Sequence, residues 1–266
     1  MLYGLRWRSL RAILPDDAVL TETTSHPLLS VVVPVRNEVG NIAPLIADIE
    51  KACAAIGPFE VVYVNDGSTD GTADKLAELA PARPWLRVVT HAQSCGQSAA
   101  VRSGVRHARS AIVATLDGDG QNDPAFLPGM VAILQKGGLH AGLVQGQRVG
   151  RKDTGFKRWQ SKIANGVRGR VLKDDTRDTG CGLKCFRREA YLALPYFDAL
   201  HRFMPALMAR EGYKVLHADV RDRPRLTGVS NYGFFDRLWV GILDLAGVWW
   251  LIRRRKRVPQ IVSETM

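Results

Sequence analysis

Cysteine is scarce in this sequence, with four residues among 266. Cys53, Cys95, Cys181 and Cys185 include no C-x-x-C pair, and no histidines stand near Cys181 and Cys185 at the spacing of zinc ligands. A disulfide scaffold and a structural zinc site are therefore excluded. We expect all four residues to be reduced thiols.

The sequence also lacks the apolar core of a secretory signal. Residues 1–11 alternate apolar and basic side chains, and residues 12–27 are mixed and contain Pro15 and Pro27. We therefore expect residues 1–27 to be a basic leader that lies over the domain or is mobile, with an amphipathic segment that contacts the membrane as the alternative. The same absence predicts that the protein stays on the cytoplasmic side, at the cytoplasmic face of a membrane.

Acidic residues are outnumbered by basic ones. The chain has 37 Lys and Arg against 26 Asp and Glu, a formal charge of +11. This excess favours anionic partners such as nucleotides, nucleic acid or an anionic membrane surface, and does not choose among them. Because 46% of the residues are hydrophobic, a disordered chain is excluded and a substantial core is expected.

Apolar, β-branched stretches alternate with amphipathic ones along the first half of the chain. Strands are expected at 28–35, 59–64, 86–90 and 111–116, with a weaker strand at 143–146. Helices are expected from a cap at Asn41 to about 56, and at 72–79, 97–108, 124–136 and within the basic stretch 148–173. The alternation predicts an α/β fold with a mostly parallel sheet, helices on both faces, and ligands at the carboxyl ends of the strands.

Two acidic turns follow two of these expected strands. One is Asp117-Gly-Asp-Gly-Gln121 and the other is Asn65-Asp-Gly-Ser-Thr-Asp70. Carboxylate oxygens suit hard cations, so the first turn is a candidate site for Mg²⁺ or Mn²⁺. A calcium EF-hand is excluded because Asn122 and Pro128 replace the required glycine and glutamate. Dinucleotide-binding and Walker-type glycine motifs are also absent.

Three motifs in this order resemble those of family 2 glycosyltransferases of the GT-A fold. They are Val33-Pro-Val-Arg-Asn-Glu38 and the two acidic turns, and the resemblance covers about residues 29–188. Within that family the chain is most similar to polyprenyl-phosphate sugar synthases of the dolichol-phosphate mannose synthase type. The resemblance implies a Rossmann-like domain over residues 28–222. It also implies direct transfer with inversion at the sugar carbon.

The same resemblance implies a donor site. The metal that bridges the donor diphosphate would be held by Asp117, Asp119 and Gln121, the two aspartates serving catalysis directly. Asp66 would lie near the base and Glu38 near the ribose. The full set expected to line the nucleotide pocket is Pro34, Arg36, Asn37, Glu38, Asp66, Gly67 and Asp117.

An acceptor site is implied by the segment from Arg177 to Arg188, in which Asp178 matches a family aspartate. The residues expected to hold the acceptor phosphate are Arg148, Lys157, Arg158, Ser161, Arg202, Arg225 and Ser230. A lipid phosphate is largely ionised near neutral pH, its second pKa being about 6, so no strong general base is needed. An alternative keeps the donor site but uses Asp178 as the base for a glycan or protein hydroxyl. A second alternative, a basic module that binds polyanions without metal, leaves the acidic turns unexplained.

The final part of the chain, residues 223–266, indicates membrane association. Residues 238–252 are apolar and aromatic apart from Asp244, and five basic residues follow at 253–257. As a helix of about 15 residues this stretch would reach about 22 Å, less than the roughly 30 Å of a hydrocarbon core. An amphipathic helix at the interface is therefore favoured over one packed on the domain or inserted with a partner. The expected partners are a nucleotide diphosphate sugar, a polyprenyl phosphate and the membrane surface, without nucleic acid. A small membrane helper subunit and self-association are left open.

Overall fold

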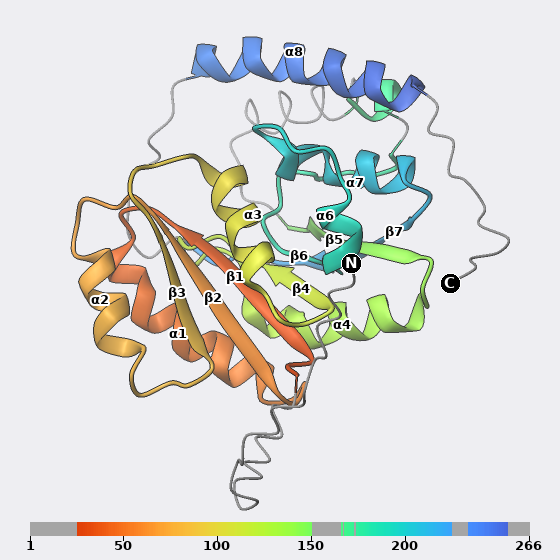
Figure 1. Ribbon diagram of the computed structural model, residues 1–266. Helices are drawn as coiled ribbons and strands as arrows, with labels where there is room; N and C mark the ends of the chain where they lie inside the picture. Colours follow the sequence, from red (N-terminus) through yellow and green to blue (C-terminus); the bar gives the residue numbers. More distant parts are fainter. Residues whose placement is uncertain (1–25, 151–165, 167, 173, 225–233, 255–266) are drawn as a thin grey trace, which may run out of the picture.

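The computed structural model describes residues 26–150, 166, 168–172, 174–224 and 234–254. Its centre is one seven-stranded sheet in the order β3-β2-β1-β4-β6-β5-β7 (Figure 1). The strands are β1 (Leu29–Val35), β2 (Phe59–Asp66), β3 (Leu86–His91), β4 (Ile112–Thr115), β5 (Ala141–Arg148), β6 (Lys184–Arg187) and β7 (Lys214–Val220). The leader expected at 1–27 lies almost entirely outside the described residues, as does most of the basic stretch 148–173.

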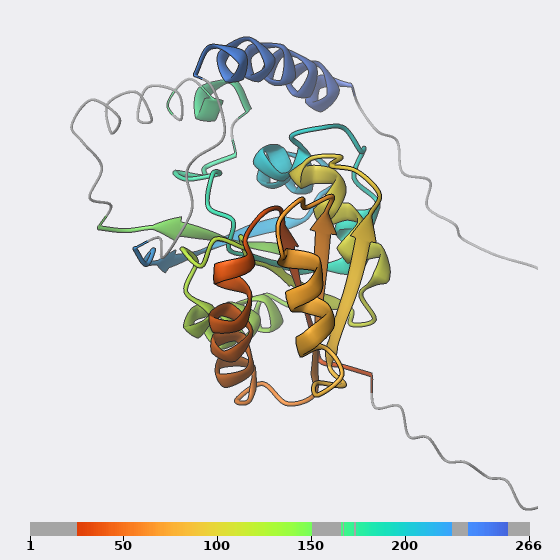
Figure 2. The ribbon, with the colours of Figure 1, turned by 90° about the vertical axis from the view of Figure 1, so that its left-hand side faces the viewer.

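Helices cover both faces of the sheet (Figure 2). One face packs against α1 (Val39–Cys53), α2 (Thr72–Leu79), the short η1 (Pro124–Phe126) and α4 (Leu127–Lys136). The other packs against α3 (Gln97–His107), α6 (Arg188–Leu192) and α7 (Leu200–Arg210). The central strands are buried on both faces, which is why their sequences are almost continuously apolar. The predicted α/β architecture is confirmed.

Strand β6 runs against its neighbours. It lies antiparallel between β4 and β5, and its first residue, Lys184, is opposite Thr115 near the end of β4. The start of β6 therefore meets the carboxyl end of β4 at one edge of the sheet. Strand β5 is longer than expected at both ends, and the polar side chains of Gln145 and Gln147 are buried within it.

Helix α1 begins at Val39 and not after a cap at Asn41, so the predicted start was wrong. The backbone N–H groups of Glu38 and Val39 donate to Thr72 Oγ1 and to Asp70 Oδ2, at 3.0 and 3.3 Å. The loop after β2 therefore satisfies this helix end from a distance in sequence. Asn41 is buried, and its side chain donates to Glu38 Oε2 at 2.6 Å.

The last helix, α8 (Phe234–Arg253), has 20 residues, which is longer than the 15 expected. It lies beside α7, across the top of Figure 1, where Val248 is 2% exposed and Arg210 Nε donates to the carbonyl of Leu251 at 3.0 Å. Its outer side is apolar, with Leu243 70% and Trp250 53% exposed. Within the described residues, none of the helices combines the length and the apolar character needed to cross a membrane.

Candidate functional site

Two adjoining cavities open at the carboxyl ends of β1, β2 and β4. The first is about 370 Å³ and the second about 270 Å³, and both are lined by Pro34, Gln97 and Asp117. The second extends toward β2 and is lined by Arg36, Glu38, Asp66 and Asp119. The first extends toward β5, β6 and α7. Asp117 therefore stands at the boundary between two parts of one site.

The loop after β4 presents Asp117 and Asp119 at that boundary. Asn122 Oδ1 accepts from the backbone of Asp117 at 2.9 Å, and Asp119 Oδ1 accepts from the backbone of Gln121 at 3.1 Å. Gly120 has φ +74°, a conformation that glycine adopts without strain. The loop is thus held by its own polar groups, which leaves Asp117 facing the cavities.

The Asp117 carboxyl is less acidic than an ordinary aspartate. Burial, reinforced by the neighbouring charge of Asp119, raises the pKa of the Asp117 carboxyl to about 6. Gln97 Nε2 donates to Asp117 Oδ1 at 2.8 Å, and a Cβ at Gly182 would lie 2.1 Å from Asp117 Oδ2. Two crowded carboxylates with oxygen donors fit a hard divalent cation, which relieves their repulsion. Gln121, the third predicted ligand, lines neither cavity among the described residues.

The second cavity contains most of the residues predicted to bind the nucleotide. Pro34, Arg36, Glu38 and Asp66 line it. Asn37 instead supports the wall, because its Oδ1 accepts from the backbone of Thr69 at 2.8 Å. Gly67 has φ +62°, and a Cβ there would lie 2.4 Å from the backbone nitrogen of Ser94. Both residues act through loop shape, and the nucleotide contacts expected of this group stay predictions.

Asp66 holds the loop after β3. Its two oxygens accept from His91 Nδ1 (2.7 Å), Ser94 Oγ (2.8 Å), and the backbone N–H groups of Cys95 (2.8 Å) and Gly96 (3.0 Å). Burial opposes ionisation, but these hydrogen bonds together lower the pKa of Asp66 below its usual value. Asp66, His91 and Cys95 also lie close enough to share a cation, although one would compete with the hydrogen bonds to Asp66.

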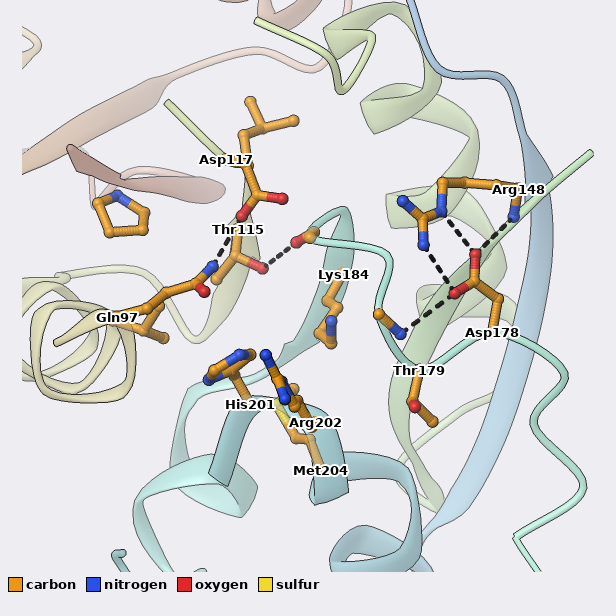
Figure 3. A pocket seen from close by; sticks show the side chains of 15 residues that line it. Gln97, Thr115, Asp117, Arg148, Asp178, Thr179, Lys184, His201, Arg202 and Met204 are labelled. Atoms are coloured by element: carbon orange, nitrogen blue, oxygen red, sulfur yellow. Dashed lines mark hydrogen bonds and ion pairs between the residues drawn. The ribbon is translucent and has the colours of Figure 1, made fainter. Parts of the chain in front are cut away.

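The first cavity holds an ion pair on the side of β5. Arg148 Nε donates to Asp178 Oδ2 at 2.6 Å and Arg148 Nη2 donates to Asp178 Oδ1 at 2.9 Å (Figure 3). Arg148 Nη1 also donates to Asp222 Oδ2 at 3.3 Å. The backbone of Gly180 also donates to Asp178 Oδ1. Paired bonds of this kind fix the orientation of an arginine and engage both oxygens of the carboxylate. Asp178 therefore orients Arg148, and both of its oxygens accept hydrogen bonds.

The floor and far wall of this cavity consist of Thr115, Lys184, His201 and Arg202 (Figure 3). Lys184 is 3% exposed and donates to the carbonyl of Cys181. Burial lowers its pKa. Burial also lowers the pKa of His201 to about 3, so this ring is neutral, and it shares a hydrogen bond of 2.8 Å with Ser98.

Of the residues expected to bind the acceptor phosphate, the structure places Arg148 and Arg202 in the first cavity. Lys157, Arg158, Ser161, Arg225 and Ser230 lie outside the described residues. Sequence reasoning missed Gln97, Lys184 and His201. Lys184 stands within the segment from Arg177 to Arg188, but its burial depends on strand β6, which is too short for its sequence to reveal it.

The model of the glycosyl transferase family 2 domain matches residues 30–194, a span that includes both acidic turns and the strand that carries Lys184. The chain belongs to glycosyl transferase family 2. The match ends shortly after α6, so α7, β7 and α8 lie outside the matched residues. The predicted family membership is confirmed.

Relatives of this family 2 chain include two groups of curated proteins. A dodecaprenyl-phosphate galacturonate synthase of Rhizobium johnstonii is 35% identical over 243 residues, which cover 86% of this chain and 68% of that protein. An undecaprenyl-phosphate 4-deoxy-4-formamido-L-arabinose transferase of Edwardsiella ictaluri is 33% identical over 208 residues, which cover 77% of this chain and 63% of that protein. The chain thus spans about two thirds of the length of these relatives.

Solved structures share the fold. A mannosyltransferase from Pyrobaculum calidifontis, in complex with GDP-Man and Mn²⁺, has a TM-score of 0.63 and 22% identity, covering 89% of this chain and 67% of that one. A glucosyl-3-phosphoglycerate synthase from Mycobacterium tuberculosis, in complex with Mn²⁺, UDP and phosphoglyceric acid, has a TM-score of 0.63 and 19% identity, covering 86% and 79%. The family 2 domain described above therefore has the expected glycosyltransferase architecture.

Proposed function

We propose that this protein transfers one sugar from a nucleotide diphosphate sugar to a polyprenyl phosphate, with inversion at the sugar carbon. The observation that carries the proposal is the ion pair of Asp178 with Arg148 in the first cavity, where the acceptor would bind. Its oxygens are bound by Arg148, and the cavity presents Arg148 and Arg202 in place of a free base. An acceptor that is already anionic fits this environment, whereas a hydroxyl would need a group to take its proton.

The donor is proposed to lie across both cavities. Its nucleoside occupies the cavity lined by Arg36, Glu38 and Asp66, and its sugar enters the cavity on the other side of Asp117. Asp117 and Asp119 hold Mg²⁺ or Mn²⁺, which supplies charge neutralisation for the diphosphate. Gln97 fixes the orientation of Asp117 through their 2.8 Å hydrogen bond. Gln121 is retained as a proposed third ligand.

The reaction joins a phosphate oxygen of the lipid to the anomeric carbon as the bond to the donor diphosphate breaks. The electron pair of that bond leaves with the nucleoside diphosphate, and no proton is transferred. Arg148 and Arg202 hold the attacking phosphate, while Asp178 keeps the Arg148 guanidinium in place. Bringing two anions together is the main barrier, so positioned cations are the principal contribution of the protein.

Helix α8 is proposed to bring the site to the membrane. Ile242, Leu243, Trp249 and Trp250 are exposed at positions seven apart, so they share the side opposite the buried Val248. Arg253 stacks on Trp249 at 4.0 Å and Arg254 on Trp250 at 5.0 Å. An apolar and aromatic face with basic residues at its end fits an anionic lipid interface. The helix therefore combines two of the interpretations considered from sequence, packing on the domain and facing lipid.

The test measures nucleoside diphosphate release and lipid-linked sugar with a panel of donors, with and without undecaprenyl phosphate. Release should require the lipid and should stop when a chelator is added. Asp119→Ala should lower turnover by at least about 10²-fold, because one ligand of the cation is lost, whereas Asp74→Ala on the exposed surface of α2 should have no effect. Transfer that persists in Asp119→Ala with unchanged metal dependence would exclude the proposed metal site.

The alternative acceptor is tested in the same assay. If a glycan or protein hydroxyl is the acceptor, product forms without polyprenyl phosphate, and Asp178→Asn should cost about 10²-fold or more through the lost base. If the lipid phosphate is the acceptor, Asp178→Asn should act mainly by raising the KM for the lipid, because Arg148 loses its anchor. Lipid-independent transfer would overturn the proposed function.

A further inference from the structure

The proposed function leaves open which sugar is transferred, and the two groups of relatives do not decide it, because their names specify one uronic acid and one uncharged sugar. A buried cation in the sugar part of the site carries more information. Lys184 opens strand β6 on the floor of the first cavity and is 3% exposed. Among the described residues, the carbonyl of Cys181 is the one acceptor bonded to its Nζ. An ammonium carries three donors.

The carboxylates of Asp117 and Asp178 act on the charge of Lys184, but among the described residues neither is hydrogen-bonded to its Nζ. Asp178 is bound to Arg148, and Asp117 faces the metal site and accepts from Gln97. The remaining neighbours on the cavity wall are the neutral side chains of Thr115 and His201, and Thr115 Oγ1 donates to the carbonyl of Gly182 at 2.8 Å. Removing an ammonium from water without a matched anion is unfavourable by several kcal/mol. A cation held this way is ready for an anionic group that arrives with the substrate.

The position of Lys184 favours the sugar over the lipid phosphate as the source of that anion. Lys184 lies directly opposite Thr115, two residues before Asp117, so it lies beneath the place where the sugar leaves the diphosphate. The lipid phosphate approaches from the side of α7 and α8, where Arg202 is exposed. The positive charge of Arg202 on α7 interacts there with the carboxylate of Asp244 on α8. The lipid head group must also attack from the face of the sugar opposite the diphosphate. Arg148 and Arg202 are therefore placed for the acceptor, and Lys184 for the donor.

We propose that Lys184 binds a carboxylate on the transferred sugar, so that the donor is a nucleotide-linked uronic acid. This inference rests on the proposed function. A uronic acid differs from the corresponding hexose by a carboxylate in place of a CH₂OH group. The carboxylate would complete the hydrogen bonding of the Lys184 ammonium and balance its charge, which a hydroxyl cannot do.

The experiment compares matched donors with the purified full chain, Mn²⁺ and undecaprenyl phosphate. The pairs are UDP-glucuronate against UDP-glucose, UDP-galacturonate against UDP-galactose, and GDP-mannuronate against GDP-mannose. For the nucleotide that the enzyme accepts, kcat/KM should be higher for the acid by at least about tenfold, the scale of one hydrogen bond to a charged group. Lys184→Met should lower kcat/KM for the acid by about 10- to 100-fold and leave the neutral donor within about threefold.

Three controls separate this result from other roles. Lys214→Met removes an exposed lysine at the opposite end of the sheet and should change neither donor. Arg202→Met should raise the KM for the lipid and keep the preference for the acid. Lys184→Arg keeps the charge and should retain part of that preference. Calorimetric titration of each donor without lipid measures the same preference as affinity, so the inference is tested even if Lys184→Met loses turnover.

Failure of the proposed function and failure of the inference about Lys184 give different results. If no donor yields a lipid-linked sugar, the proposed function is wrong. If neutral donors are transferred and preferred over the acids, the function stands and the inference about Lys184 is overturned. It is equally overturned if Lys184→Met weakens both members of a pair to the same extent and raises the KM for the lipid, since Lys184 would then contact the acceptor phosphate.

Discussion

Replacing Asp117 by asparagine should make the metal-free protein more stable at neutral pH, although it removes a proposed metal ligand. Burial and the charge of Asp119 raise the pKa of Asp117 from 3.8 to about 6. One pKa unit corresponds to about 1.4 kcal/mol, so the folded protein disfavours the ionised carboxylate by roughly 3 kcal/mol. The asparagine side chain would be neutral and of the same shape, and its oxygen would still accept from Gln97.

The effect of Asp117→Asn on the free energy of unfolding should depend on pH. Below about pH 4 the carboxyl is protonated in both the folded and the unfolded chain, so the substitution should change stability little. Between pH 4 and 6 the unfolded chain ionises first, and above pH 6 the full penalty acts on the folded wild type. Because the side chain is only partly shielded from solvent, we expect a gain of about 1–2 kcal/mol for Asp117→Asn above pH 6. That corresponds to a Tm increase of about 2–8 °C.

The assay is thermal unfolding in a chelator at pH 4 and pH 7.5, followed by addition of Mn²⁺. The Tm of the Asp117→Asn variant should exceed that of the wild type at pH 7.5 and equal it at pH 4. The Tm of the control Asp74→Asn, a substitution of an exposed residue, should equal that of the wild type at both pH values. Saturating Mn²⁺ should raise the Tm of the wild type and not that of the variant, because only the wild type binds the cation tightly. A variant that is less stable at pH 7.5, or equally shifted at both pH values, would refute the electrostatic reasoning.

Two further predictions concern Gly182 and α8. Gly182→Ala would place a methyl group 2.1 Å from Asp117 Oδ2, so the carboxylate must move. The affinity for Mn²⁺, measured by calorimetry, should therefore fall at least about tenfold. Unchanged affinity would show that the close approach of Gly182 to Asp117 is unimportant. Leu243→Glu with Trp250→Glu should reduce co-sedimentation with vesicles containing anionic phosphatidylglycerol by at least about tenfold. Full retention of vesicle binding in the double variant would exclude the outer side of α8 as the lipid contact.

The sequence predicts the first half of the sheet well because each strand and helix there is specified locally. The helix at Thr72–Leu79 was predicted to the residue, and the buried strands are β-branched along their length. The start of α1 was predicted wrongly because Thr72 and Asp70 supply its cap from more than 30 positions away. A local reading assigns that role to Asn41, whose side chain is in fact turned inward.

The donor site was more accessible to sequence reasoning than the acceptor site. Asp117 and Asp119 follow a strand directly, so the parallel arrangement alone places them at the edge where ligands bind. Lys184 is different, because its burial depends on β6 entering the sheet between β4 and β5, and four residues of strand give no period from which to infer it. Arg148 is among the predicted residues, but its ion pair with Asp178 joins positions 30 apart and could not be read from either segment.

The place of β6 also constrains the order in which the sheet can form. Strand β5 precedes β6 in the chain, yet it reaches β4 only through β6, and β7 is attached only through β5. The four strands β1 to β4 can therefore pair as they are synthesised, whereas β5 must wait for a strand about 40 residues further on. A nascent chain that ended after β5 would contain both acidic turns and still lack the wall at Gly182 and the floor at Lys184. The donor motifs are thus made early, and the chamber in which they act closes last.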